Sequence, residues 1–341
     1  MNKFLNLSDI QRRNVFESVA AKVDLPAQVI EKDFWVTAII QIIFALPMAK
    51  HLVFKGGTSL SKGWKLIERF SEDIDLAIDP TEILGSSESN PTKKQIKKLR
   101  KVASLFVSEQ FSRMIYEMIT RQKLESFINV KAQSGGIGDN TYPEPRQIYI
   151  RYKSVFGQGL DYLRPDIVLE VSARSLLEPT EPIKINSIIG DNLPIIPIED
   201  SLINAATPAK TFLEKAFLLH EIFSVSNNRT KADRKSRHLY DLHVMMNKDF
   251  AVTAIKDDEL WNSILHHRKI YTSVKGVDYT PDVRNHIQLL PCKDSIDFWR
   301  SDYDAMKESM IYGNKPSFDE LLTSMEELQE RFRRSNKDDL K

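Results

Sequence analysis

The stretch FKGGTSLSKGWKLIERFSEDIDLAI, residues 54–78, begins with two adjacent glycines after an apolar run and ends with two aspartates in a strand-like run. The alternation in DIDLAI predicts a strand, and residues two apart on a strand share a face. If this strand begins at Ser71, then Ser71, Asp73 and Asp75 point the same way, and the apolar residues between them point into a core. The short run HLVF before the glycines predicts a second buried strand that ends in a turn.

Asp73 and Asp75 together predict a magnesium site. Two carboxylates held side by side repel each other unless a cation lies between them. Magnesium prefers oxygen ligands and commonly binds a few protein carboxylates together with the phosphates of a substrate. The alternative is an edge strand with solvated acids and an unrelated glycine turn. The glycines upstream favour the combined magnesium and nucleotide site.

The Gly-Gly-Thr-Ser turn predicts the nucleotide contacts. Glycines allow the backbone to approach an anion closely, and a helix that follows them presents free N–H groups and the positive end of its dipole. The two hydroxyl side chains add hydrogen-bond donors. We therefore expect a nucleoside triphosphate to bind at this turn and its flanks, through Lys55, Gly56, Gly57, Thr58, Ser59 and Ser71.

The remaining pattern predicts alternating helices and strands, followed by helices alone. Residues 8–46 are typical of two helices broken near Pro26, and a long amphipathic helix is expected over residues 92–121. Runs rich in Ile, Val, Phe and Tyr predict four strands, LESFINVKAQ, RQIYIRYKSVF, RPDIVLEVSAR and PIKINSIIG.

This order of elements predicts an α+β protein in two domains. From Pro197 onward the pattern is helical. We expect an α/β domain with a mixed sheet and N-terminal helices over residues 1–190. A mainly helical domain is expected over residues 191–341.

The composition excludes several classes of protein. The 341 residues carry 48 basic and 47 acidic side chains, so a polyanion site must come from local clusters. The single cysteine, Cys292, excludes an internal disulfide framework. The N-terminus has no apolar segment typical of a signal peptide, and the longest apolar stretch, WVTAIIQIIFALPM, is too short to span a bilayer. We expect a soluble, cytoplasmic protein with no membrane partner.

The glycine-to-aspartate stretch resembles the first motif of the DNA polymerase β-like nucleotidyltransferases. More narrowly, it resembles the AbiEii-type toxins of bacterial type IV toxin–antitoxin and abortive-infection systems. Other similar pieces are IEKDFWVT (30–37), DIVLEVSAR (166–174), TFLEKAFLLHE (211–221), SRHLYDLHVMM (236–246) and DYDAMKESMIYGNKPSFDELL (302–322). The resemblance therefore covers most of the chain and implies a polymerase β-like nucleotidyltransferase core.

The resemblance also implies a third catalytic carboxylate on a neighbouring strand. DIVLEV offers Asp166 and Glu170, and Glu170 is the better candidate because it lies in the middle of the expected strand. An ordinary acid on the solvent face of a half-buried sheet explains Glu170 equally well.

Two residues of the helical part complete the implied site. Lys215 lies on or beside the apolar stripe of a helix, and the resemblance makes it a contact of the triphosphate. A lysine that extends to solvent and pairs with a core acid is the alternative. Asp241 is implied to be an active-site residue that orients Lys215, whereas an ion pair with Arg237 one turn earlier is the alternative.

Basic clusters provide candidate contacts for RNA phosphates. One is KKQIKKLRK at 93–101, and the other is NRTKADRKSR at 228–237. A run of charges is often only a solvated helix face, but the second cluster directly precedes the Asp241 helix. The expected RNA-binding residues are therefore Arg229, Lys231, Arg234 and Lys235.

These features predict a magnesium-dependent enzyme that transfers a nucleoside monophosphate from a triphosphate to an acceptor. The resemblance makes RNA the expected acceptor, with the 3′ end of tRNA as the best single choice, and it implies blocked translation and growth. It also implies a cognate antitoxin encoded nearby, with or without direct contact. The alternatives are transfer to a protein or a small molecule, and a non-catalytic module that binds a nucleotide or RNA.

Overall fold

The computed structural model describes residues 2–85, 88, 90–137, 141–157, 164–193, 202–225 and 233–335. The chain divides into two compact units. The first consists of Met1–Lys65 and Phe70–Ala206, and the second of Leu66–Arg69 and Thr207–Lys341. The chain therefore leaves the first unit for four residues and then returns to it.

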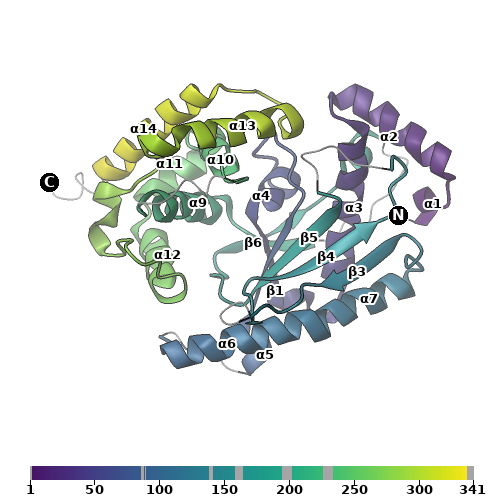
Figure 1. Cartoon of the computed structure of the whole chain (residues 1–341), viewed down its shortest axis with the longest axis horizontal. Helices are drawn as coiled ribbons and strands as arrows, with labels where there is room; N and C mark the ends of the chain where they lie inside the picture. The colour runs from purple at the N-terminus through teal and green to yellow at the C-terminus, as the bar shows by residue number, and fades with distance from the viewer. Residues whose placement is uncertain are drawn as a thin grey trace. The chain divides into compact units, whose positions relative to one another are not determined.

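A mixed sheet forms the centre of the first unit, with seven strands among the described residues in the order β3-β4-β5-β2-β1-β7-β6 (Figure 1). The strands are β1 (Leu52–Lys55), β2 (Ile74–Ile78), β3 (Ile128–Ala132), β4 (Arg146–Tyr152), β5 (Asp166–Ser172), β6 (Thr180–Lys184) and β7 (Leu202–Ala206). β2 is parallel to β5 and β1 to β7, whereas the other neighbours are antiparallel. With the surrounding helices, this sheet confirms the α+β class.

Two helices of the first unit begin directly after a side-chain cap. Ser8 caps α2 and Thr92 caps α6, each through a reciprocal capping box with a glutamine three residues later. The long helix expected over 92–121 is present as α6, the π-helical turn η3 and α7. The helical elements are α1 (Asn2–Leu5), α2 (Asp9–Val23), α3 (Ala27–Phe44), η1 (Pro47–His51), α4 (Gly56–Thr58), η2 (Ser59–Gly63), α5 (Pro80–Leu84), α6 (Lys93–Phe106), η3 (Val107–Phe111), α7 (Ser112–Arg121) and α8 (Ile188–Asn192).

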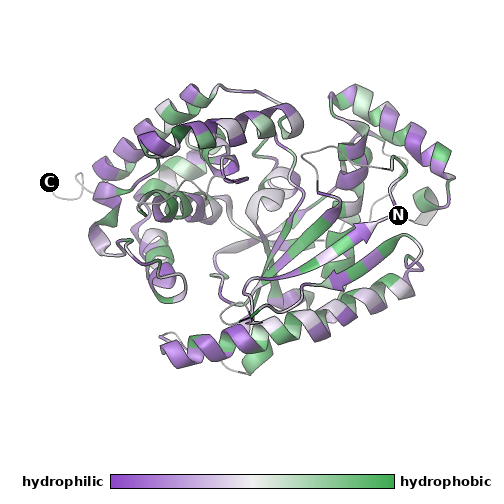
Figure 2. Ribbon diagram, viewed as in Figure 1, coloured by the Kyte–Doolittle hydropathy of each residue, from purple (hydrophilic) through white to green (hydrophobic). Residues whose placement is uncertain are grey.

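One face of the sheet is buried in an apolar core. Ile74, Leu76 and Ile78 of β2 have no exposed surface, which confirms the predicted alternation. On the same face, the ring of Phe54 on β1 lies 6.4 Å from that of Phe44 on α3. Figure 2 shows hydrophobic residues along the strands and mixed hydrophobic and hydrophilic residues along α6 and α7. The opposite face of the central strands is therefore the one that carries polar side chains.

The second unit is built from helices packed around aromatic side chains. The ring of Trp261 lies 4.4 Å from that of Phe217 and 5.3 Å from that of Phe332. Its helical elements are α9 (Pro208–Phe223), α10 (Arg237–Met245), α11 (Asp249–Lys256), α12 (Asp258–Tyr271), η6 (Pro281–His286), η7 (Lys293–Ser295), α13 (Ile296–Met310) and α14 (Phe318–Ser335).

Leu66–Arg69 is attached to the second unit through its backbone. Arg69 forms an isolated β-bridge with Ile311. The carbonyl oxygen of Glu68 accepts hydrogen bonds from the N–H groups of Tyr312 (3.1 Å) and Gly313 (3.3 Å). The pattern of SLSKGWKLIERF, with Leu60, Trp64 and Ile67 at four- and three-residue spacing, predicts a helix, but these contacts show that the helix does not continue to Phe70. That helix ends at Gly63, because the following residues pair with a distant strand-like segment instead of with their own turn.

Two further local predictions are wrong. β2 begins at Ile74 rather than at Ser71, so Ser71 and Asp73 precede the strand. The region after Pro197, expected to be helical, contains β7, whose sequence LINAA holds only one β-branched residue. Pairing with β1 and β6 on its two sides, rather than local propensity, makes this segment a strand.

Candidate active site

A row of polar residues crosses the sheet of the first unit. Lys55 at the end of β1 is the register partner of Asp75 on β2, and Asp75 is the partner of Glu170 on β5. Glu170 is in turn the partner of Gln147 on β4, and the Gln147 amide donates a 2.7 Å hydrogen bond to its carboxylate. Register partners lie on one face of a sheet, so the structure brings two predicted carboxylates, Asp75 and Glu170, side by side.

The glycine turn lies directly against Asp75. Gly56 has φ of +78°, in the left-handed region that favours glycine. A Cβ atom at this position would lie 2.1 Å from Oδ2 of Asp75, far inside van der Waals contact. The glycine turn and Asp75 lie at opposite ends of the quoted stretch of sequence, but in the structure they are in direct contact.

Negative charge accumulates where β2 and β5 meet. Burial raises the pKa of Glu170, and the charges of Asp75 and Asp73 raise it further, against the opposing hydrogen bond from Gln147. An excess of carboxylates suits a divalent cation that prefers oxygen ligands. Among the described residues, no group of three or more His, Cys, Asp or Glu side chains is arranged to hold a metal ion.

Asp73 lies immediately before β2 and is held by its surroundings. Its side chain is largely buried and its Oδ1 lies 3.6 Å from Nη1 of Arg164. The hydroxyl of Thr58 lies within hydrogen-bond distance of the Asp73 carbonyl oxygen and, at 2.9 Å, of Ser71 Oγ. The glycine turn thus contacts both aspartate positions: Gly56 lies against Asp75, and Thr58 contacts the backbone of Asp73.

The hydroxyl groups predicted as phosphate donors make hydrogen bonds inside the protein. Thr58 and Ser59 are fully buried. Ser59 Oγ donates to the carbonyl oxygen of Gly56 over 2.9 Å, and Thr58 is engaged with the segment before β2. Both side chains stabilise the turn. The backbone N–H groups of the turn are therefore better candidates for a phosphate contact than the hydroxyl groups of Thr58 and Ser59.

Charged residues of α3 support this site, and the sequence analysis assigned them no role. Lys32 Nζ lies 2.5 Å from Oε2 of Glu72, next to Asp73, and 3.2 Å from the carbonyl oxygen of Asp166 at the start of β5. Asp33 pairs with Lys62 of η2 and accepts a 2.7 Å hydrogen bond from the N–H of Ile188. The sequence signal for this supporting role is the run of three charged residues, Glu31, Lys32 and Asp33, in the otherwise apolar helix IEKDFWVTAII.

The second unit holds a buried cluster of two cations and one anion. Asp241 on α10 accepts hydrogen bonds from Arg69 Nε (2.7 Å) and Nη2 (2.8 Å), and its Oδ2 lies 2.9 Å from Lys215 Nζ on α9. Burial acts to raise the pKa of Asp241, but the charges of Arg69 and Lys215 outweigh it and lower this pKa to about 2. Burial lowers the pKa of Lys215, which the charge of Asp241 opposes. Asp241 therefore holds Lys215, and Arg69 is a partner that the sequence analysis missed.

His238 lies beside this cluster. Its Nδ1 is 3.4 Å from Lys215 Nζ, and its Nε2 is buried without a hydrogen-bond partner among the described residues. Burial, followed by the charge of Lys215, lowers the pKa of His238 well below its ordinary value. The imidazole is consequently neutral next to the ammonium group.

The candidate RNA-binding segment is only partly described. Arg229 and Lys231 lie outside the described residues. Arg234 and Lys235 are half-buried in the turn before α10, where Asp302 of α13 accepts hydrogen bonds from the N–H groups of Arg234 (2.7 Å) and Ser236 (2.9 Å). The turn is therefore fixed by a carboxylate from another helix.

A mixed sheet with adjacent carboxylates on β2 and β5, against a glycine turn, is an arrangement that suits a triphosphate and a divalent cation. The family model of the nucleotidyl transferase AbiEii toxins of type IV toxin–antitoxin systems matches residues 41–324, which is most of the chain. The chain belongs to this family, and it is a nucleotidyltransferase toxin.

Solved structures with a similar chain course include two bacterial proteins. MenT4, a nucleotidyltransferase toxin from Mycobacterium tuberculosis H37Rv, is 15% identical with a TM-score of 0.49, over 94% of this chain and 87% of its own. JHP933 from Helicobacter pylori is 14% identical with a TM-score of 0.44, over 92% of this chain and 96% of its own. No curated protein matched the sequence. Among the described residues, no helix is both long and apolar enough to cross a membrane.

Proposed function

We propose that the protein transfers a nucleoside monophosphate from a nucleoside triphosphate to the 3′ end of an RNA, with tRNA as the favoured acceptor. The observation that carries this proposal is the row formed by Asp75 and Glu170 across β2 and β5, with Gly56 in contact with Asp75. Adjacent carboxylates beside a glycine turn suit a triphosphate and its metal ion.

The proposed roles follow the position of each residue. Asp73 and Asp75 are the candidate magnesium ligands, because magnesium commonly binds through one or two carboxylates plus substrate phosphates. Magnesium, when bound, would neutralise charge that develops on the phosphates. Glu170, next to Asp75, would orient the attacking hydroxyl. Lys55 at the end of β1 and the backbone of the glycine turn would face the triphosphate.

Lys215 of the second unit is proposed as a further triphosphate contact. The buried cluster of Arg69, Lys215 and Asp241 has two positive charges and one negative charge, so it retains an excess positive charge that suits a phosphate. Asp241 and Arg69 would act as positioning residues for the Lys215 ammonium group.

The reaction requires positioning more than covalent chemistry. The acceptor hydroxyl loses its proton to a site carboxylate or to water, and its oxygen forms a bond to the α-phosphorus. The bond between the α-phosphorus and the bridging oxygen breaks, and pyrophosphate leaves. Modification of tRNA 3′ ends would block translation and arrest growth, and a cognate antitoxin would counteract it.

The test is transfer of label from each of the four α-³²P nucleoside triphosphates to total RNA, purified tRNA or protein, with magnesium or with EDTA. We expect label in tRNA, only with magnesium. Asp73→Asn and Asp75→Asn should each reduce the rate on the order of a thousandfold. Asp282→Asn is the matched control, because Asp282 is exposed in the second unit, and it should retain the parent rate.

Each arm can contradict one part of the proposal. Label in protein or in a small molecule alone would support the other acceptor classes. Full transfer in EDTA would remove magnesium from the mechanism. A folded Asp75→Asn protein with the parent rate would remove the carboxylate row from the active site.

A further inference from the structure

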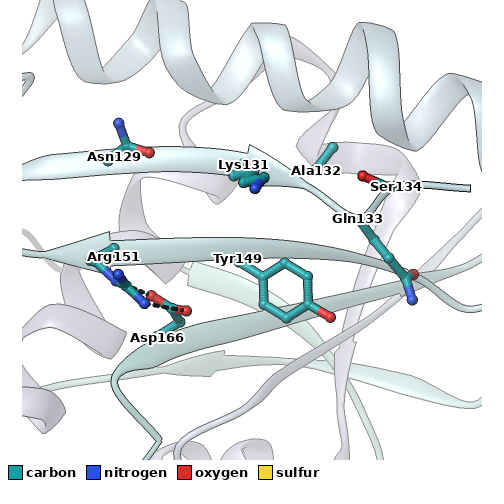
Figure 3. A pocket seen from close by; sticks show the side chains of 8 residues that line it. All are labelled: Asn129, Lys131, Ala132, Gln133, Ser134, Tyr149, Arg151 and Asp166. Atoms are coloured by element: carbon teal, nitrogen blue, oxygen red, sulfur yellow. Dashed lines mark hydrogen bonds and ion pairs between the residues drawn. The ribbon is translucent and has the colours of Figure 1, made fainter.

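A groove with a volume of about 540 Å³ lies on the sheet of the first unit, over β3, β4 and β5. Figure 3 shows Tyr149 in its middle, the Arg151–Asp166 ion pair toward one end and Gln133 toward the other. Lys131 of β3 lies opposite Tyr149 in the strand register. The groove is open, and its lining combines charged and amide groups with the apolar surface of Ala132 and the tyrosine ring.

The groove shares a face with the carboxylate row. Gln147, Tyr149 and Arg151 alternate along β4, so they lie on the face that carries Glu170. Tyr149 Oη donates a 2.7 Å hydrogen bond to Gln147, which in turn donates to Glu170. Tyr149 and Arg151 lie about 7 Å and about 13 Å along the strand from the level of Glu170.

The groove and the glycine turn lie on opposite sides of the carboxylates. In the strand order, β1 and its turn flank β2 on one side, whereas β5, β4 and β3 extend on the other. A triphosphate that binds at the glycine turn leaves the β5–β4–β3 side to the second substrate. The groove is therefore placed for the acceptor rather than for the nucleotide.

The side chains of the groove suit a single-stranded nucleic acid. The Tyr149 ring is half-buried and its hydroxyl is tethered, so it offers a fixed surface for a base. Lys131 is exposed and has no ion-pair partner among the described residues. Arg151 is 64% exposed and is held in place by hydrogen bonds to both oxygens of Asp166, 2.6 and 3.0 Å long. Cations beside one aromatic ring match phosphates and a stacked base better than they match an apolar protein surface.

We propose that this groove binds the single-stranded 3′-terminal nucleotides of the RNA acceptor. Tyr149 stacks on a base, and Lys131 and Arg151 contact the phosphates next to it. The terminal hydroxyl then lies toward Glu170. This inference rests on the proposed function, because it assigns the acceptor subsite of the same reaction.

The test compares two matched double variants. Lys131→Gln/Tyr149→Ala removes one cation and the ring from the groove. Lys22→Gln/Tyr116→Ala makes the same changes at exposed positions of α2 and α7, outside both basic clusters. Binding of a fluorescent ten-nucleotide RNA that ends in CCA is measured at several salt concentrations without triphosphate. Steady-state KM values for RNA and for the triphosphate are measured in parallel.

The groove variant should bind the RNA at least about tenfold more weakly, with a flatter salt dependence, and its KM for the triphosphate should stay within twofold. Tyr149→Phe should keep the parent RNA affinity, because it retains the ring and loses only the hydrogen bond to Gln147. Thermal melting checks that each variant is folded.

The outcomes separate the groove from the proposed function. The proposed acceptor site is refuted if the parent and the folded groove variant bind the RNA with equal affinity. It is also refuted if the parent does not bind the RNA. A rise in the KM for triphosphate instead of RNA also overturns it. If the parent binds RNA through the groove and yet labels no RNA, the proposed transfer to RNA is refuted, whereas the groove is confirmed as an RNA-binding site.

Discussion

Lys32 on α3 forms a buried ion pair with Glu72, 40 residues later in the chain, with 2.5 Å between Nζ and Oε2 and 1% of each side chain exposed. Glu72 directly precedes Asp73, and Lys32 also reaches the backbone carbonyl of Asp166 at the start of β5. One ammonium group therefore connects a helix to both strands that carry the candidate catalytic carboxylates.

Lys32→Met should destabilise the protein strongly, because it leaves the Glu72 carboxylate buried without its cation. Removal of one partner of a buried pair costs about 3–5 kcal/mol. The double variant Lys32→Met/Glu72→Gln should be more stable than Lys32→Met alone. Urea denaturation measures both. Arg13→Met, which breaks the exposed pair with Glu17, is the control and should cost less than about 1 kcal/mol. Equal effects at the two sites would refute the buried-pair account.

Gly56→Ala should abolish nucleotide transfer, because its Cβ would displace the Asp75 carboxylate. Gly85→Ala is the matched control: Gly85 has a similar φ of +74°, and apart from its chain neighbours no atom of the described residues lies within 4 Å of a Cβ at that position. Both variants carry the strain of a left-handed alanine, about 1 kcal/mol. Only Gly56→Ala adds the collision, so transfer rates measured at equal folded fraction should differ sharply. Similar rates for the two would contradict contact between the turn and Asp75.

Lys215→Met should reduce transfer activity more than stability, whereas Asp241→Asn should reduce stability strongly. Without Lys215, Asp241 keeps its two hydrogen bonds to Arg69, so the loss of stability is moderate. Without the charge of Asp241, two cations remain buried together, which costs about 3–5 kcal/mol. Lys215→Met should still lose most transfer activity and raise the KM for the triphosphate. A stable, fully active Lys215→Met protein would assign Lys215 a purely structural role.

His238 should make stability fall in mild acid. Its pKa is lowered well below the ordinary value of 6.5, so below pH 6.5 the unfolded chain binds a proton that the folded protein does not. Stability therefore decreases as pH falls through this range, by about 1.4 kcal/mol per pH unit for one such group. Denaturation at pH 7.5 and 5.5 should show a smaller loss for His238→Gln than for the parent. His266→Gln, at an exposed position, should behave as the parent does; an identical loss in all three would exclude His238.

Local patterns were sufficient wherever neighbouring residues determine the structure. The two helices expected over residues 8–46, the helix expected from residue 92 and the strand expected in DIDLAI are all present, the last as Ile74–Ile78. Such signals depend on hydrogen bonds and burial within a few residues, so they can be read from a single segment.

Local patterns were insufficient where a distant partner decides the outcome. Residues 66–69 have a helical pattern but form a β-bridge with Ile311, and Leu202–Ala206 becomes a strand between β1 and β6. No propensity within either segment reports those partners.

The sequence by itself determined the α+β class, the glycine turn and the two aspartates as candidate site residues, because spacing and residue type carry that information. Glu170 became a candidate through the family resemblance, since an ordinary acid on the sheet explained it equally well. Only the tertiary structure decided that Glu170 lies beside Asp75, that Arg69 holds Asp241 and that Lys32 pairs with Glu72. In these three pairs, strand register and buried ion pairs join residues that are 40 to 172 positions apart. Their identity depends on how the chain closes on itself, and that geometry is absent from any local stretch of sequence.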